Sequence, residues 1–273
     1  MPYRYAHYFV GFVLAVILAG FWASYWSIIG DVPIAFHIHA ISASSWLLLL
    51  IIQSVAIHRR SNRFHKKMGQ ASFALFPFLI LGFVMIIDVT ANRFVAGNSP
   101  FVQHNGPSFA VGMAIAIAAY LTLYYQALKT RRNVKLHAGY MLATPLILFE
   151  SPFSRVIETF FPWANFIGSE GPHQVQDMIA ISDAMVTIFA LGLYFMDRKH
   201  GAPWLVAACF VAVQAVVMWS VPFLRELDPM LTAYAQVPLA MTVFLGIAAG
   251  ALTAWLGWRA GGVAKRPASP SLA

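Results

Sequence analysis

The chain has 273 residues, of which 60% are hydrophobic and 10% are charged, and its formal net charge is +8 at pH 7. Soluble globular domains carry about 25% charged residues, so this composition excludes an ordinary soluble domain. The positive charge does not indicate a nucleic-acid-binding protein, because basic cytoplasmic loops are a general property of membrane proteins.

Apolar segments predict an all-α integral membrane protein, a bundle of about eight transmembrane helices. A helix needs about 20 apolar residues to cross the hydrocarbon core, and lipid offers no hydrogen-bond partners to a backbone outside a helix. The segments are residues 8–29, 34–57, 69–90, 108–128, 137–157, 175–196, 203–222 and 234–257. Pro145 and Pro152 interrupt the fifth, so its continuity stays open. We expect one transmembrane domain over residues 1–258 and a disordered cytoplasmic tail at 259–273.

The connections between these segments alternate in charge. Three of them hold Asp31, Glu170 and Asp228. Fifteen of the eighteen Lys and Arg residues lie in the N-terminal segment, the three connections that alternate with these and with the one at 91–107, and the tail: Arg4, Arg59, Arg60, Arg63, Lys66, Lys67 (connection 58–68), Lys129, Arg131, Arg132, Lys135 (129–136), Arg198, Lys199 (197–202), Arg259, Lys265 and Arg266; none of the fifteen lies in the connection 91–107. The positive-inside rule then predicts that both termini are cytoplasmic.

The second segment carries a polar stripe. His39, Trp46 and Gln53 follow one another at steps of seven residues, which is nearly two helical turns, so they share one face. A polar face is expected to turn toward the bundle interior, because exposure to lipid is costly. Small hydroxyl residues beside it, Ser42 and Ser45, also fit a purely structural role in close helix packing.

Two basic connections share a pattern that ends in histidine. Residues 59–65 (RRSNRFH) and 131–137 (RRNVKLH) place His65 and His137 at the cytoplasmic start of the next segment. Two imidazoles at equal depth on two helices are a typical ligand pair for a b-type haem. The alternative is that each histidine lies at the headgroup interface beside the basic residues.

The outer half of the bundle gathers the remaining ionisable candidates. His173 and Asp177 are four residues apart and share a face of the sixth segment. Buried ionisable residues in a membrane are functional candidates, although the two loop-proximal histidines also fit a solvated position. The set consists of His39, His104, His173, Asp88, Glu150, Asp177 and Asp183.

The region of residues 34–157 resembles an uncharacterised bacterial polytopic membrane family, a domain of unknown function. The residues that carry the resemblance are His39, Trp46, Gln53, the RFH run at 63–65, Gly69, the KLHAGYM run at 135–141 and Arg155. Lys66 and Ala138 follow the two histidines where the family has arginine. The family implies the bacterial inner (cytoplasmic) membrane and no particular activity. More loosely, the layout is similar to di-haem membrane cytochromes of the b type.

Three functional hypotheses stay open, and the oligomeric state is undetermined. The first is a haem-binding membrane oxidoreductase with an inner haem on His65 and His137, an outer haem on His39 with His104 or His173, and a quinone or another redox partner. The second is a proton-coupled small-solute transporter or binding protein that uses Asp88, Glu150, Asp177 and Asp183. The third is a metal-dependent enzyme acting on lipid, with zinc or iron on His39, His173 and Asp177.

Overall fold

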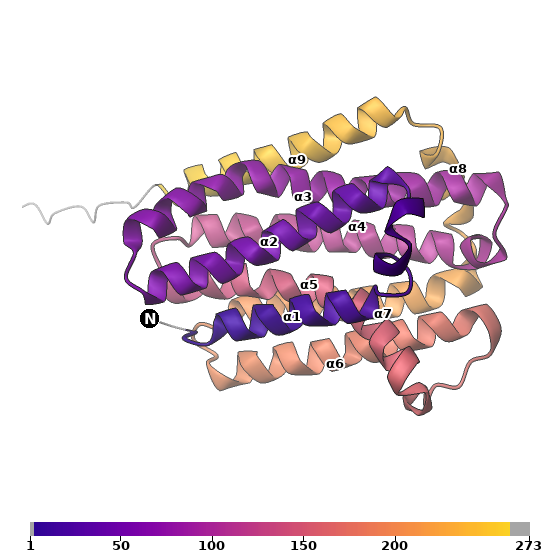
Figure 1. Ribbon diagram of the computed structural model, residues 1–273, viewed down its shortest axis with the longest axis horizontal. Helices are drawn as coiled ribbons and strands as arrows, with labels where there is room; N and C mark the ends of the chain where they lie inside the picture. Colours follow the sequence, from indigo (N-terminus) through magenta and orange to yellow (C-terminus); the bar gives the residue numbers. More distant parts are fainter. Residues whose placement is uncertain (1–2, 263–273) are drawn as a thin grey trace, which may run out of the picture.

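The computed structural model describes residues 3–262, and this part of the chain is helical without strands. Part of the predicted C-terminal tail, residues 263–273, lies outside the described residues. The long helices are α1 (Ala6–Gly20), α2 (Ile34–His58), α3 (Asn62–Ala96), α4 (Pro100–Lys129), α5 (Val134–Phe160), α6 (Gln174–Met196), α7 (Ala202–Leu224) and α9 (Leu239–Ala260). The short ones are η1 (Trp26–Asp31), η2 (Pro162–Ala164), η3 (Gly171–His173) and α8 (Asp228–Tyr234). The long helices run alongside one another in one bundle (Figure 1).

Within the described residues, six helical segments are long and apolar enough to cross a membrane. They are α2, α3, α4, the Gly171–Met196 segment that includes α6, α7 and α9. The chain is therefore a multi-pass helical membrane protein, as its composition predicts. The two remaining long helices are α1, which is apolar but has 15 residues, and α5, which has 27.

The first helix is shorter than the apolar segment 8–29 suggests. It ends at Gly20, where a Cβ atom would lie 2.1 Å from the carbonyl oxygen of Pro152. Beyond it the chain turns into η1, and the Tyr25 hydroxyl lies 2.9 Å from Nδ1 of His37 on α2. Hydropathy alone misses this end, because residues 21–25 are mostly apolar and yet fold as turns.

Helix α5 is continuous in spite of its two prolines. Proline cannot donate to the carbonyl four residues earlier, so Pro145 leaves the Met141 carbonyl without its usual helical donor. The Thr144 hydroxyl donates to that carbonyl at 2.8 Å. Hydroxyl side chains commonly satisfy the backbone around proline in membrane helices, and here one of them satisfies the Met141 carbonyl.

Glycines bring the helices of the bundle into close contact. A Cβ atom at Gly82 of α3 would lie 2.5 Å from Oγ of Ser42 on α2. A Cβ atom at Gly112 of α4 would lie 2.2 Å from Sδ of Met218 on α7. Small residues allow such approaches between membrane helices, whose packing depends on van der Waals contact. These contacts set the positions of the polar side chains described below.

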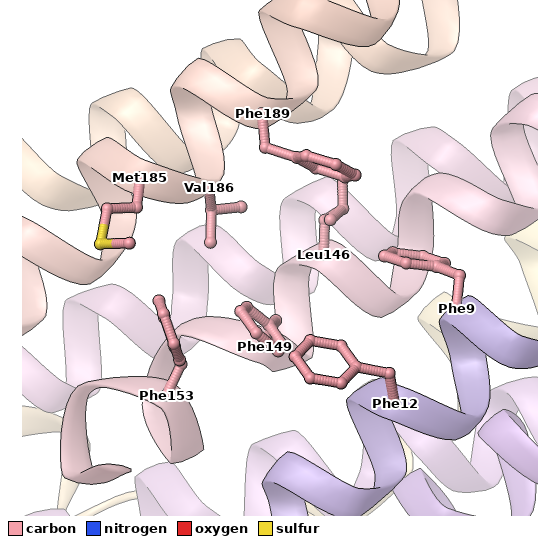
Figure 2. Close-up of a pocket in the computed structure, with 8 residues that line it drawn as sticks. All are labelled: Phe9, Phe12, Leu146, Phe149, Phe153, Met185, Val186 and Phe189. Atoms are coloured by element: carbon pink, nitrogen blue, oxygen red, sulfur yellow. The ribbon is translucent and has the colours of Figure 1, made fainter. Parts of the chain in front are cut away.

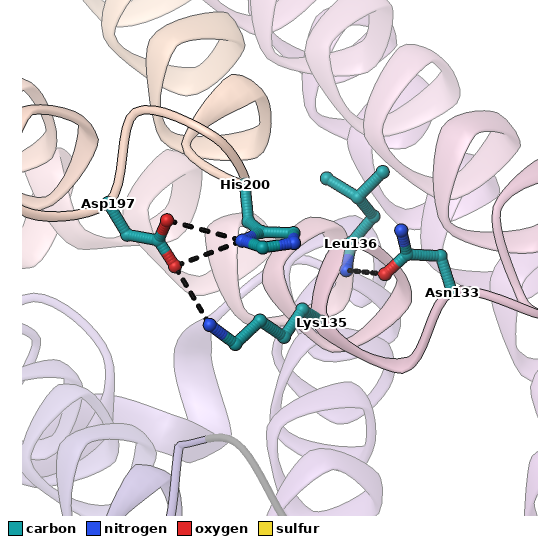
Figure 3. A network of polar contacts seen from close by, with 5 residues as sticks. All are labelled: Asn133, Lys135, Leu136, Asp197 and His200. Atoms are coloured by element: carbon teal, nitrogen blue, oxygen red, sulfur yellow. Dashed lines mark hydrogen bonds and ion pairs between the residues drawn. The ribbon is translucent and has the colours of Figure 1, made fainter.

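The two ends of the bundle differ in charge. Both ends of the described chain and the connections that begin at residues 59, 130 and 197 lie at the left in Figure 1. Among the ten acidic residues only Asp197 belongs to this basic end, where it accepts hydrogen bonds from Lys135 at 3.1 Å and His200 at 3.2 Å (Figure 3). The basic connections of the sequence thus lie together at one end of the bundle, and the acidic residues other than Asp197 lie away from that end.

Candidate functional site

Two acidic side chains lie together inside the bundle, where α5, α6 and α7 meet. Glu150 of α5 is 5% exposed and Asp183 of α6 is fully buried. The two carboxyl groups are close enough to interact electrostatically. The Ser182 hydroxyl, next to Asp183 in the chain, donates to the Glu150 carbonyl at 3.2 Å, which ties the two helices together at this level.

Glu150 is held by polar neighbours. The Gln214 amide of α7 donates to Oε2 at 3.2 Å, and the Ser154 hydroxyl lies 3.4 Å from Oε1. The Arg155 guanidinium attracts the carboxyl at longer range. It donates to the Ser151 carbonyl at 2.6 Å, and no ion pair within 4.0 Å joins it to Glu150 in the described chain.

Asp183 differs from Glu150 because neither of its carboxyl oxygens has a hydrogen-bond partner in the described chain. A buried carboxyl group without a hydrogen bond is costly, and a buried charge without one costs still more. Two carboxyl groups in one dry site do not both ionise readily, because their charges repel. The arrangement can therefore hold a proton within the bundle.

An apolar groove of about 330 Å³ lies one helical turn away from both acids. Phe153 follows Glu150 by three residues, and Val186 follows Asp183 by three. In Figure 2 side chains from α1, α5 and α6 converge on this groove: Phe9, Phe12, Leu146, Phe149, Phe153, Met185, Val186 and Phe189. These side chains cover one side of the α5–α6 interface with hydrocarbon.

A second buried polar network lies between α4, α6 and α7. The Gln176 amide donates to Asn105 at 2.8 Å, and the Ser108 hydroxyl donates to the Met218 carbonyl at 2.7 Å. Gln176, Asn105 and Ser108 are all fully buried. The polar groups of this network bond to one another and link three helices, so the network fits a structural role.

The Asp177 carboxyl group has hydrogen-bond partners at both oxygens. Its carboxyl oxygens accept from the Trp219 indole at 2.9 Å, from the Ser169 hydroxyl at 3.0 Å and from the Ser169 backbone amide at 2.7 Å. These bonds hold the loop before α6 against α7. Asp177 was predicted to share a site with Glu150 and Asp183, but its hydrogen bonds give it a loop-anchoring position.

The outer histidines are paired differently from the predicted haem ligands. The rings of His104 and His173 are 5.9 Å apart, centroid to centroid, whereas His39 packs at 4.9 Å against Phe83 of α3. His39 therefore packs on a phenylalanine and not on a second histidine, and the His173 ring also contacts Phe223 at 4.3 Å and Trp219 at 5.3 Å. Over residues 3–262, no three side chains of His, Cys, Asp or Glu come together as a metal site, so the predicted set of His39, His173 and Asp177 is not assembled.

The inner histidines are neighbours. His65 of α3 and His137 of α5 are close enough for their charges to interact. His137 Nδ1 donates to the Ala127 carbonyl of α4 at 2.8 Å, which leaves Nε2 as the lone-pair nitrogen of a neutral ring. Gln53 also lies at this end, and its Oε1 is buried without a partner in the described chain.

The remaining predicted residues lie elsewhere. Trp46 is fully buried and donates from Nε1 to the Thr144 hydroxyl at 2.9 Å. Asp88 lies near the far end of α3, beside α8 and α9, and its Oδ2 lies 2.9 Å from the Thr242 hydroxyl.

Sequence reasoning missed Gln214. It is the only amide side chain in the apolar helix α7, and this was a usable signal.

Comparison with protein families, curated proteins and solved structures finds no match for this chain. Its function must therefore be argued from the geometry of its own side chains.

Proposed function

We propose that the chain is an eight-span protein of the bacterial inner membrane that couples proton movement to a small solute at the Glu150–Asp183 pair. The observation that carries the proposal is the Asp183 carboxyl, which is fully buried, unbonded by any described residue and beside a second acid. Acidic residues inside a membrane bundle mark proton relays in pumps and transporters.

The topology in this proposal adds α1 and α5 to the six membrane-length segments. At 1.5 Å per residue the 27 residues of α5 extend about 40 Å, more than the hydrocarbon thickness of about 30 Å. The 15 residues of α1 extend only about 22 Å, and η1 continues the chain beyond it. An even number of spans agrees with the two described chain ends at the basic end, which the positive-inside rule places in the cytoplasm.

The charge balance of the site favours one ionised and one protonated carboxyl group. Arg155 supplies one compensating positive charge near Glu150. A second buried negative charge would cost several kcal/mol without a partner. Asp183 accepts no hydrogen bond from the described chain, so it is the group we assign as proton carrier, while Gln214 and Ser154 hold the Glu150 carboxyl group.

The backbone around Glu150 supports movement. Pro145 and Pro152 flank this residue within α5, and prolines are the commonest sites of bending in helices. Helix α5 is continuous here, so the two prolines supply points of bending and not a break. A bend between the two prolines would change the distance between Glu150 and Asp183, which is the variable that controls proton sharing.

Infrared difference spectroscopy on the purified protein tests the assignment directly. A protonated carboxyl in a dry site gives a C=O stretch that ionised carboxylates lack. We expect this band in the wild type and in Glu170→Gln, which changes an exposed acid, and its loss in Asp183→Asn. Proton uptake into proteoliposomes should fall at least tenfold in Asp183→Asn and Glu150→Gln. The proposal would be overturned if Asp183→Asn kept the C=O band and if proton uptake by Asp183→Asn and Glu150→Gln equalled that of the wild type.

A second candidate function has its own observation. His65 and His137 lie together, and the bond from His137 Nδ1 to Ala127 orients the ring with Nε2 available, as in imidazoles that bind metals. These two residues would hold a b-type haem, which supplies one-electron transfer to a quinone or another redox partner. A Soret band in protein from haem-replete cells, lost in His137→Ala and kept in His200→Ala, supports it; a colourless wild type contradicts it.

A further inference from the structure

A polar pocket of about 310 Å³ lies on the other side of the bundle from α6, where α3, α8 and α9 meet. The polar side chains in its wall are Asp88 and Asn92 of α3, Tyr234 of α8 and Gln236 in the connection to α9. The backbone of residues 235–239 completes the wall. The pocket is thus built from segments more than 130 residues apart in the sequence, and it shares no residue with the Glu150–Asp183 site.

Asp88 places a carboxyl group in this wall without a positive partner. It is 8% exposed, and the described chain contains no ion pair to it. Arg93, one turn further along α3, has its guanidinium over the Phe36 ring at 5.6 Å. The Thr242 hydroxyl lies 2.9 Å from Oδ2 of Asp88 and connects the carboxyl group to α9.

The neighbouring groups add hydrogen-bond acceptors. No described backbone amide donates to the carbonyl oxygens of Ala235, Gln236 or Val237. The Tyr234 phenol lies beside Asp88, and burial together with that carboxyl raises the pKa of Tyr234, so the phenol stays protonated at neutral pH. The pocket therefore combines one unpaired acid, free carbonyl groups in its wall and a neutral aromatic ring.

The pocket is held in shape by apolar packing beneath it. Leu231 of α8 is buried against Ala91 and Phe94 of α3. This contact fixes the short helix α8 over the end of α3, so Tyr234 is carried on an anchored element. A preformed pocket near 300 Å³ is at the small end of the range for small-molecule sites.

We propose that this pocket binds a small organic cation through a primary ammonium group, with Asp88 as its counter-charge. A primary ammonium brings three donors to a wall rich in acceptors, and the Tyr234 ring offers a cation–π surface. The wall holds a single carboxyl group, and in the described part of the chain no three side chains of His, Cys, Asp or Glu come together as a metal site. The site is independent of the proton-coupled function proposed above, so either proposal can fail without the other.

The test uses purified full-length protein in nanodiscs of zwitterionic lipid, with calorimetry at constant ionic strength. The probes are n-butylammonium and its neutral analogue 1-butanol, with tetramethylammonium as a cation that has no N–H donor. We expect saturable binding of butylammonium, none of butanol, and at least fivefold weaker binding of tetramethylammonium. Absence of saturable butylammonium binding to the wild type, or equal binding of butanol, would overturn the proposal.

Three variants locate the binding. Asp88→Asn should weaken butylammonium binding at least tenfold, and Gln236→Leu, at an exposed position that does not threaten folding, should weaken it two- to fivefold. Glu226→Gln removes an exposed acid just before α8 and should bind like the wild type. If Asp88→Asn and Gln236→Leu both bind like the wild type, or if Glu226→Gln loses binding as they do, the pocket is not the site.

Discussion

The indole Nε1 of Trp46 donates a 2.9 Å hydrogen bond to the hydroxyl of Thr144, which in turn donates to the Met141 carbonyl. One hydroxyl group therefore satisfies a buried tryptophan on α2 and the backbone defect that Pro145 creates in α5. The Thr144 carbonyl also accepts from the Tyr120 hydroxyl of α4 at 2.9 Å. Thr144 is the point at which three helices are joined.

Thr144→Val is expected to destabilise the protein. It leaves a buried indole donor and the Met141 carbonyl without partners, and each unsatisfied group costs about 1–3 kcal/mol. Thr144→Ser retains the hydroxyl and should stay close to the wild type. Unfolding in mixed detergent micelles measures the difference; equal midpoints for the valine and serine variants would contradict this account.

Gly82→Ala tests the close contact between α2 and α3. The added methyl group would lie 2.5 Å from Ser42 Oγ and 2.9 Å from His39 Cα, so we expect a loss of about 1–3 kcal/mol from overpacking. Gly192→Ala is the matched control, because a Cβ atom there meets nothing within 4 Å. That variant should be neutral or slightly more stable, since alanine favours helix over glycine.

Acid sensitivity at the basic end should depend on Asp197. Hydrogen bonds from Lys135 and His200 lower the pKa of its exposed carboxyl group. A lowered pKa in the folded state stabilises the protein above the ordinary Asp value of about 4, and this contribution is lost as the pH falls through the lowered pKa.

In Asp197→Asn, the fall in unfolding midpoint between pH 6 and pH 3 should therefore be smaller than in the wild type. Asp228→Asn, which removes an acid paired with Arg225 at the other end, controls for general loss of charge. The same acid-induced fall in the wild type and in Asp197→Asn would show that this contact does not contribute.

Asp183→Asn should separate stability from function. Because Asp183 is assigned as a protonated carboxyl without a described partner, its replacement by an equally neutral and unbonded amide should leave the free energy of unfolding close to that of the wild type. Loss of stability comparable to that of Thr144→Val would indicate that Asp183 is a structural residue. Thermal unfolding by intrinsic fluorescence provides the measurement alongside the flux assay.

Composition was sufficient to predict an all-helical membrane protein, because the requirement for apolar helices in lipid leaves few alternatives. The positions of the long helices follow the apolar segments, but α1 ends early, at Gly20, where it packs closely against Pro152 of α5. In α5, the Thr144 hydroxyl satisfies the carbonyl that Pro145 leaves without a helical donor. Local hydropathy predicts neither contacts between helices nor side-chain rotamers.

The sequence was sufficient to identify the acidic residues of the candidate site, but not to tell which of them lie together. Glu150 and Asp183 stand out because they are ionisable within apolar segments. Asp177 looks equivalent in the sequence, yet Trp219 and Ser169 satisfy it. Asp88 faces α8 and α9 in a separate pocket. Which acids meet depends on helix neighbours, and a single sequence does not reveal them.

The close packing of Gly20 against the Pro152 carbonyl links the end of α1 to α5. On the other side of this joint, the Arg155 guanidinium lies over the Phe21 ring at 4.9 Å, so α1 is fastened to α5 at two successive points. A change of angle at Pro152 must therefore carry the end of α1 with it. Because Pro152 is only two residues from Glu150 along α5, a change of helix angle at the acids would also move the connection at residues 21–33.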